Sequence, residues 1–377
     1  MNKKVLGGIL AVIIIIVVIL IATNKKAATG NVVIGGDFLM SGPFGLIGSI
    51  QKNASEMAVD EINASGGING RKLELVIEDN ASDGKKAVDA YKALTAKGIK
   101  LIMTDSSPAA AAVRPAVIAD NNFLMVPGAT APSYFDGSPL TCRIALTAKN
   151  FGPAYADLVV KRGFKTAVAL LPDNEYGKGL ATELETSFAA KGLSPLTIEF
   201  YNASLTGGDF RTNITKLVQK QKDVDVMIVT NPANTVLPMF KQISELGWKK
   251  PIVSDYYTIQ NPAVTDLSVV NGIDYIDYEY SRGANPKESS VATEFKQKYA
   301  AKFGAAPVYL GAAHYDAIKL IAEAVSKVGD DPKKVGDYIS SLKDYKGVTG
   351  TLSFNSDCEV SRETIFRTVK DAQILDL

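Results

Sequence analysis

Short apolar runs alternate with longer amphipathic segments along most of this chain, and this alternation limits the fold more than any other feature. The run NVVIGG at 31–36 is typical of a buried strand, and residues 47–62 have the apolar spacing of a helix. Strands that alternate with helices form parallel sheets covered by helices on both faces, so an α/β fold is predicted. Further strands are expected at 72–78, 99–105, 123–126, 166–171, 196–201, 224–230 and 251–254, and further helices at 85–97, 109–120, 180–191, 210–220, 235–246, 289–303 and 310–328.

The pattern ends near residue 126 and starts again near residue 166, which predicts two similar α/β units with extra helices toward the C-terminus. A length of 377 residues exceeds one average domain and fits two lobes. Ligands of parallel sheets bind outside the carboxyl ends of the strands. Candidate binding residues are therefore expected in the loops after Gly36, Asp105, Val126, Leu171, Thr230 and Ser254.

The charge balance argues against a nucleic-acid partner. Lys and Arg total 41 against 40 Asp and Glu, and the basic residues form no cluster or stripe of the kind that follows a phosphate backbone. A hydrophobic content of 46% and a charged content of 21% are ordinary for a globular protein. Such a chain can bury enough apolar surface to be stable without metal ions or disulfides.

The first 29 residues are predicted to lie outside this fold, as a membrane anchor or signal segment with a linker. Residues 5–24 carry no charge, and lysines lie on both sides of the run. A secretory apolar region usually has ~7–15 residues, whereas a spanning helix needs roughly 17–25, so the length favours an uncleaved anchor. Cleavage at the small residues 27–29 stays open, and with either outcome the domain is expected on the extracytoplasmic side.

Residues that could carry catalysis are scarce. His314 is the single histidine, so the chain has no second histidine for a His-based metal site or a proton relay. A lone histidine on a helix is usually packed or exposed, and no nucleophile elbow, phosphate-binding loop or dinucleotide fingerprint occurs. Asp173 and Glu175 fit a solvated loop. The sequence therefore predicts no enzyme activity, no metal and no cofactor.

Short motifs near the expected strand ends follow one another in a recognisable order: S-G-P at 41–43, A-V-D-E-I-N at 58–63, G-G-I-N-G-R-K-L at 66–73, E-D-N at 78–80, P-G-A-T at 127–130, D-N-E-Y-G at 173–177, D-F at 209–210, Y-D-A at 315–317 and G-T-L-S-F at 350–354. Together they resemble the type I periplasmic-binding-protein superfamily, in its leucine/isoleucine/valine-binding branch. Single pieces are weak signals, but so many in order are specific. The resemblance extends from about residue 31 to residue 377.

This resemblance implies two Rossmann-like lobes with parallel sheets, joined by a three-crossing hinge, with a ligand bound in the cleft between them. It assigns residues 30–145 with 280–358 to the N-terminal lobe, and residues 146–279 with 359–377 to the C-terminal lobe. The crossings are expected near Ala145–Lys149, Tyr278–Tyr280 and Cys358–Val360.

The function that the resemblance implies is capture of an amino acid, or a similar small apolar carboxylate, and its delivery to the permease subunits of an ABC importer. The lobes of such a protein close around the solute, and the closed state is recognised at the membrane. Proteins of this type are usually monomers. The same fold also serves in sensory ectodomains, so a ligand-binding protein for a separate signalling partner is the alternative.

The resemblance places two loops of the first lobe at the ligand. Ser107 lies at the family's carboxylate-binding serine, next to Ser106, and a helix N-terminus there would add its dipole. An ordinary N-cap is the alternative interpretation, because serine is preferred at that position. Thr130 lies at a ligand-contacting threonine, with backbone groups of Gly128 and Ala129 beside it. A tight loop that needs small residues would have the same composition.

In the second lobe the resemblance points to Tyr176 and to an acid that pairs with the ligand's ammonium group. Asp255 is expected in that role, and a register error of one residue would put Tyr256 there instead. Packing of the tyrosine and a solvated aspartate at a strand end are the alternatives. The chain departs from the family at 231–234, where an aromatic residue is usual, while the loop with Ile47 is apolar. Aliphatic or aromatic amino acids are therefore the favoured ligands, ahead of amides and aromatic carboxylates.

The two cysteines of the chain, Cys142 and Cys358, lie close to the expected hinge crossings. In an exported protein they could form a disulfide or be two small buried side chains. No CxxC spacing occurs, which excludes a zinc ribbon or a thioredoxin-type motif. A Cys142–Cys358 disulfide is therefore a hypothesis.

Overall fold

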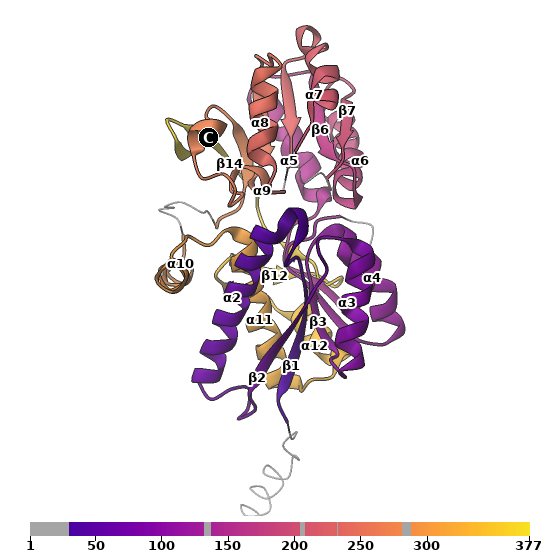
Figure 1. Cartoon of the computed structure of the whole chain (residues 1–377), viewed down its shortest axis with the longest axis vertical. Helices are drawn as coiled ribbons and strands as arrows, with labels where there is room; N and C mark the ends of the chain where they lie inside the picture. The colour runs from indigo at the N-terminus through magenta and orange to yellow at the C-terminus, as the bar shows by residue number, and fades with distance from the viewer. Residues whose placement is uncertain (1–29, 132–136, 204–207, 232, 281–287) are drawn as a thin grey trace, which may run out of the picture.

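The computed structural model describes residues 30–377 except 132–136, 204–207, 232 and 281–287. Two α/β units follow one another along the long axis of the molecule (Figure 1). Among the described residues, no helix combines the length and the apolar composition needed to cross a bilayer. The anchor expected at 5–24 lies outside the described residues.

The first unit is built on five parallel strands in the order β2-β1-β3-β4-β5. Residues on successive strand positions face opposite sides: Ile102 and Leu124 pack against one group of helices, Leu101 and Met103 against another. Helices α3 and α4 cover the first side, and α2 with α11 covers the second. The elements are β1 (Val32–Phe38), β2 (Leu73–Asp79), β3 (Leu101–Thr104), β4 (Phe123–Val126), β5 (Thr141–Arg143), α2 (Gly45–Ala64), α3 (Gly84–Ala96), α4 (Ser107–Ala119), α10 (Ser290–Phe303), α11 (Tyr309–Val328) and α12 (Pro332–Ser341), with the short helix η1 (Gly42–Phe44).

The second unit contains a seven-stranded sheet in the order β15-β14-β10-β9-β8-β6-β7. Five of its strands are parallel, while β14 runs antiparallel to β10 and β15 antiparallel to β14. The elements are β6 (Ala167–Pro172), β7 (Thr197–Tyr201), β8 (Val226–Val229), β9 (Ile252–Asp255), β10 (Asp274–Asp277), β14 (Ile365–Lys370), β15 (Gln373–Asp376), α5 (Ala148–Lys161), α6 (Glu175–Ala190), α7 (Arg211–Val218), α8 (Val236–Glu245) and α9 (Tyr256–Ile259), with η2 (Gln221–Asp223) and η3 (Leu267–Val270).

The chain passes between the two units at three places: at 144–147 before α5, between the end of β10 and the start of α10, and at 362–364 before β14. The last of these lies beyond the expected crossing at Cys358–Val360. Residues 360–361 form β13 (Val360–Ser361), which pairs with β12 (Gly350–Phe354) in a small sheet that also contains β11 (Tyr345–Gly347). This pairing keeps the segment with the first unit, so the sheet change comes a few residues later.

A disulfide joins Cys142, on β5, to Cys358, just before β13. The next residues along both segments pair as well, because Arg143 forms an ion pair with Glu359 and its backbone N–H donates to Cys358 O at 2.9 Å. Arg143 is fully buried and also donates to Ala131 O at 2.7 Å. These links lie within the first unit, next to two of the crossings.

Candidate ligand-binding site

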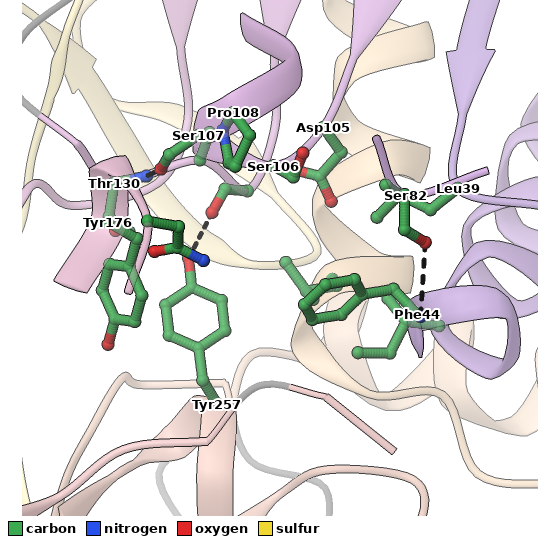
Figure 2. A pocket seen from close by; sticks show the side chains of 15 residues that line it. Leu39, Phe44, Ser82, Asp105, Ser106, Ser107, Pro108, Thr130, Tyr176 and Tyr257 are labelled. Atoms are coloured by element: carbon green, nitrogen blue, oxygen red, sulfur yellow. Dashed lines mark hydrogen bonds between the residues drawn. The ribbon is translucent and has the colours of Figure 1, made fainter. Parts of the chain in front are cut away.

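A cavity of about 70 Å³ lies between the two units, at the carboxyl ends of the strands. This volume exceeds the roughly 10–15 Å³ that one water needs, so the cavity can hold solvent or a small solute. Loops of the first unit supply most of its wall, and the second unit supplies three residues (Figure 2). The lining residues are Leu39, Phe44, Ile47, Ser82, Asp105, Ser106, Ser107, Pro108, Gly128, Ala129, Thr130 and Leu310 of the first unit, with Asn174, Tyr176 and Tyr257 of the second.

The serines expected to bind a carboxylate form one end of this cavity. Ser106 is the N-cap of α4, and its Oγ accepts from Ala109 N at 3.3 Å. Ser107 Oγ accepts from the backbone N–H groups of Thr130 at 3.3 Å and Ala131 at 3.1 Å, so it joins the two loops. Both the N-cap interpretation and the position at the cavity hold for this segment. The N-terminus of α4 therefore points its partial positive charge at the cavity.

A second helix N-terminus reaches the same cavity from the other unit. Asn174 caps α6 by accepting from Gly177 N at 3.0 Å, and both Asn174 and Tyr176 line the cavity. Two helices of 13 and 16 residues thus direct their N-termini at one small volume. Such an arrangement favours an anionic group on the ligand.

The loop at 128–130 lies beside these serines, as expected from the sequence. A Cβ at Gly128 would overlap the Asp105 carboxyl and the Leu310 side chain, so the glycine permits this close approach. Its carbonyl oxygen accepts a hydrogen bond from the Tyr257 hydroxyl, which belongs to the second unit. Asn234 N also donates across to Pro43 O at 3.1 Å. The two units are therefore closed around the cavity in this structure.

Asp255, expected to face the ligand, lies outside the cavity lining and behind Tyr176. Its Oδ2 accepts from the hydroxyls of Tyr155 at 3.0 Å and Tyr176 at 2.8 Å. Its Oδ1 caps α9, accepting from the backbone N–H and the hydroxyl of Thr258, each at 3.1 Å. The short side chain is fully buried by these contacts, and burial raises its pKa. Asp255 therefore positions Tyr176 instead of reaching into the cavity.

Tyr256, the alternative for the same role, also turns away from this cavity. Its ring packs against Tyr278 and Tyr309, with centroids 4.3 Å and 5.0 Å away. The following residue, Tyr257, lines the cavity instead. Tyr257 is the second residue of the short helix α9, just after β9, so the rule that ligands meet strand ends identified the segment but not the side chain.

Asp105 is a lining residue that the sequence did not single out, although it ends an expected strand one residue before Ser106. It is buried, and the Gln51 amide donates to its Oδ2. Burial raises its pKa to about 7, against the opposite effect of the nearby Ser106 and Gly128 N–H groups and the Gln51 amide. Ile47, which the sequence did single out, lines the cavity together with the apolar residues Leu39, Phe44 and Leu310.

His314 does not take part in this site. It is buried on α11, its Nδ1 hydrogen-bonds Leu310 O at 2.8 Å, and it contacts Phe38 edge-on. Burial lowers its pKa to about 3, so the ring is neutral. Within the described ranges, no group of three or more His, Cys, Asp or Glu side chains could hold a metal ion.

Comparison with known proteins gives a family match over almost the whole described chain. The model of the family described as "Periplasmic binding protein" matches residues 31–373. The chain is 25% identical over 332 residues to the Leu/Ile/Val-binding protein homolog 1 of Brucella abortus, covering 87% of each chain. It is also 25% identical over 349 residues to the leucine-, isoleucine-, valine-, threonine-, and alanine-binding protein of Pseudomonas aeruginosa, covering 88% of each.

A solved structure shares this architecture. The branched-chain amino acid transporter substrate-binding protein LivJ of Streptococcus pneumoniae, in complex with isoleucine, superposes with a TM-score of 0.79 at 25% identity. The match covers 91% of the present chain and 97% of the other.

Proposed function

The chain belongs to the periplasmic binding protein family, and from this premise we propose that it captures a small amino acid between its lobes for delivery to an ABC importer. It is a solute-binding protein and not an enzyme. The observation that carries the proposal is the meeting of two helix N-termini, α4 and α6, at a small closed cavity with one apolar wall. Such a cavity suits a solute with a carboxylate at one end and a hydrocarbon group at the other.

The polar end of the cavity offers the groups that a carboxylate needs. Ser106, Ser107 and Thr130 surround the N-terminus of α4, where their hydroxyls can donate hydrogen bonds and the helix dipole favours an anion. The apolar wall, with Phe44, Ile47 and Leu310 among its members, suits an aliphatic or aromatic side chain. Relatives named for leucine, isoleucine and valine, and a related structure that holds isoleucine, support the same class of solute.

The place of the protein in the cell follows from the same premise. Members of this family bind solutes outside the cytoplasm, and the uncharged run at 5–24 is long enough to tether the chain to the membrane. We propose that this run anchors the binding domain at the extracytoplasmic face. Fractionation of cells that express the full chain, or a chain lacking residues 1–29, tests the anchor: only the full chain should sediment with membranes.

Thermal unfolding in the presence of single amino acids tests the proposed solute class. A ligand at about 100 times its dissociation constant adds about 2.7 kcal/mol to the free energy of unfolding, which raises the melting temperature clearly. We expect such a rise with leucine, isoleucine or valine after the protein has been unfolded, dialysed and refolded to remove any retained solute. A rise with amides or aromatic acids, and none with amino acids, would contradict the proposed solute while leaving the fold in place.

A further inference from the structure

Among the described residues that line the cavity, Asp105 is the one acidic side chain. In the view of Figure 2 it lies between the polar end, formed by Ser107 and Thr130, and the apolar end, where Phe44 lies. Its carboxyl group points into the open space above Tyr257. An acid in this place meets the middle of a solute whose carboxylate lies at the serines.

The hydrogen bonds of Asp105 leave one oxygen available. Gln51 donates to Oδ2, while Oδ1 is buried and no donor within the described part of the chain, the nearby N–H groups of Ser106 and Gly128 included, reaches it with hydrogen-bond geometry. Gly128 brings its backbone against this carboxyl because it has no side chain. A buried acceptor without a partner is costly, and the cost is greater for a charged one. A donor supplied by the solute would remove this cost.

Asp255 is not available for the same task. Two tyrosine hydroxyls and two groups of Thr258 already donate to its oxygens, and it lies behind Tyr176. A residue with four donors gains little from a fifth. Of these two acids, only Asp105 faces the cavity with an oxygen that lacks a partner.

The groups around Asp105 make a positive charge on the solute favourable. Gln51 on α2 is neutral, and burial raises the pKa of Tyr257 on α9 and of Tyr309 on α11, so both stay protonated. His314 on α11 is also neutral, because burial lowers its pKa to about 3. No described lining residue is a lysine, arginine or histidine. A cation in the cavity would therefore be attracted by Asp105 without repulsion from a basic lining residue.

We propose that Asp105 accepts the ammonium group of the bound amino acid, with the carboxylate of the ligand at the N-terminus of α4 and its side chain on the apolar wall. The inference rests on the proposed function, since it takes the solute to be an amino acid. It assigns recognition of the amine to the first lobe, which also provides the serines. This lobe alone would then bind both charged groups of the ligand.

A matched pair of probes tests this inference on the full chain: leucine, and 4-methylpentanoate, which lacks only the amine. The wild-type protein should bind leucine about 100-fold more tightly, because loss of one partner leaves the other charge buried and unpaired. In Asp105→Asn the preference should fall below about tenfold. Asp37→Asn is the control, because Asp37 is buried in the same lobe, is held by Asn80 and Thr104, and does not line the cavity. It should keep the wild-type preference.

Proton release gives a second readout that a merely structural role of Asp105 would not change. At pH 7 this carboxyl, with a pKa of about 7, is about half protonated in the ligand-free protein. An ammonium group should expel that proton, so calorimetry in buffers of different ionisation enthalpy should detect release of about half a proton per leucine. The proton release should disappear in Asp105→Asn and persist in Asp37→Asn, because the second variant keeps Asp105.

The outcomes separate the two proposals. If the wild-type protein binds no amino acid at all, the proposed function fails. If it binds leucine and 4-methylpentanoate equally, the function stands for carboxylates and the role of Asp105 is overturned. If Asp105→Asn loses affinity for both probes by the same factor, the role of Asp105 is likewise overturned, because the residue then only shapes the cavity. Equal binding of the two probes by the wild-type protein would refute the role of Asp105 even if the variant does not fold.

Discussion

Replacement of Asp105 by asparagine should change how the stability of the ligand-free protein depends on pH. The side chain is fully buried, and its pKa rises from 3.8 to about 7 because burial disfavours the charged form. Asparagine has nearly the same size and can still accept from the Gln51 amide. The comparison therefore isolates the cost of a buried carboxylate.

The sign of the effect follows from the protons that each state binds. Because the pKa is higher in the folded state, that state binds the proton more tightly, and the free energy of unfolding falls as the pH rises from about 4 to about 7. The full difference between 3.8 and about 7 corresponds to about 4 kcal/mol. Between pH 5 and pH 8, this carboxyl lowers the free energy of unfolding by about 2.5 kcal/mol.

Urea unfolding at pH 5 and pH 8, followed by circular dichroism after removal of any retained solute, measures this difference. We expect the free energy of unfolding of Asp105→Asn, relative to wild type, to increase by about 2.5 kcal/mol from pH 5 to pH 8. Other buried carboxyls, such as Asp37 and Asp277, are present in both proteins and cancel in the comparison.

Asp225→Asn is the control with the opposite sign. Backbone N–H groups of Lys165 and Thr166 hold the pKa of Asp225 below its usual value, so its stabilising effect is complete above about pH 4 and is lost only toward lower pH. The free energy of unfolding that Asp225→Asn loses should therefore be the same at pH 5 and pH 8. If the relative stability of Asp105→Asn is also the same at both pH values, the carboxyl is solvated in the ligand-free protein and the reasoning is refuted.

Three further changes test the links around the cavity. The Cys142→Ser, Cys358→Ser double variant should lose about 2–5 kcal/mol of unfolding free energy in urea, because the disulfide closes a separation of 216 residues. Wild-type protein treated with dithiothreitol should lose the same amount, and a different result would contradict this explanation. Tyr257→Phe removes the hydrogen bond to Gly128 O that joins the closed lobes. Calorimetry should therefore show about 2- to 12-fold weaker solute binding, with little change in stability. Unchanged affinity would mean that this bond does not hold the closed state. Gly128→Ala places a methyl group against Asp105 and should cost about 1–3 kcal/mol of stability, and a melting temperature equal to that of the wild type would contradict this close approach.

The sequence predicted most of the loops of the site because their positions follow from the fold. Strand ends of a parallel sheet meet at one edge, and this rule alone selects the loops at 106–107 and 128–130. Asp105 was overlooked because it ends a strand of apolar residues and its exposure to a cavity depends on the missing side chain of Gly128. The inward turn of Asp255 could not be predicted either, since it depends on a cap and two hydroxyls from distant segments.

Some elements were not predicted because their local sequence signals are misleading or weak. Helix α5 contains Gly152 and Pro153, two residues that usually interrupt a helix, yet Gly152 is needed where α5 packs against Glu183 of α6. Strands β14 and β15 form an antiparallel edge with few buried residues, so their pattern is weak. In both cases contacts between segments far apart in the sequence override the local pattern.

A crystal structure of the protein with leucine tests the central claim most directly, namely that the cavity between the lobes holds an amino acid by its carboxylate. We expect the carboxylate within hydrogen-bonding distance of Ser107 and Thr130 at the N-terminus of α4, with the side chain toward Phe44 and Ile47. Leucine bound in the reverse orientation, or at a different place on the protein with this cavity empty, would contradict it.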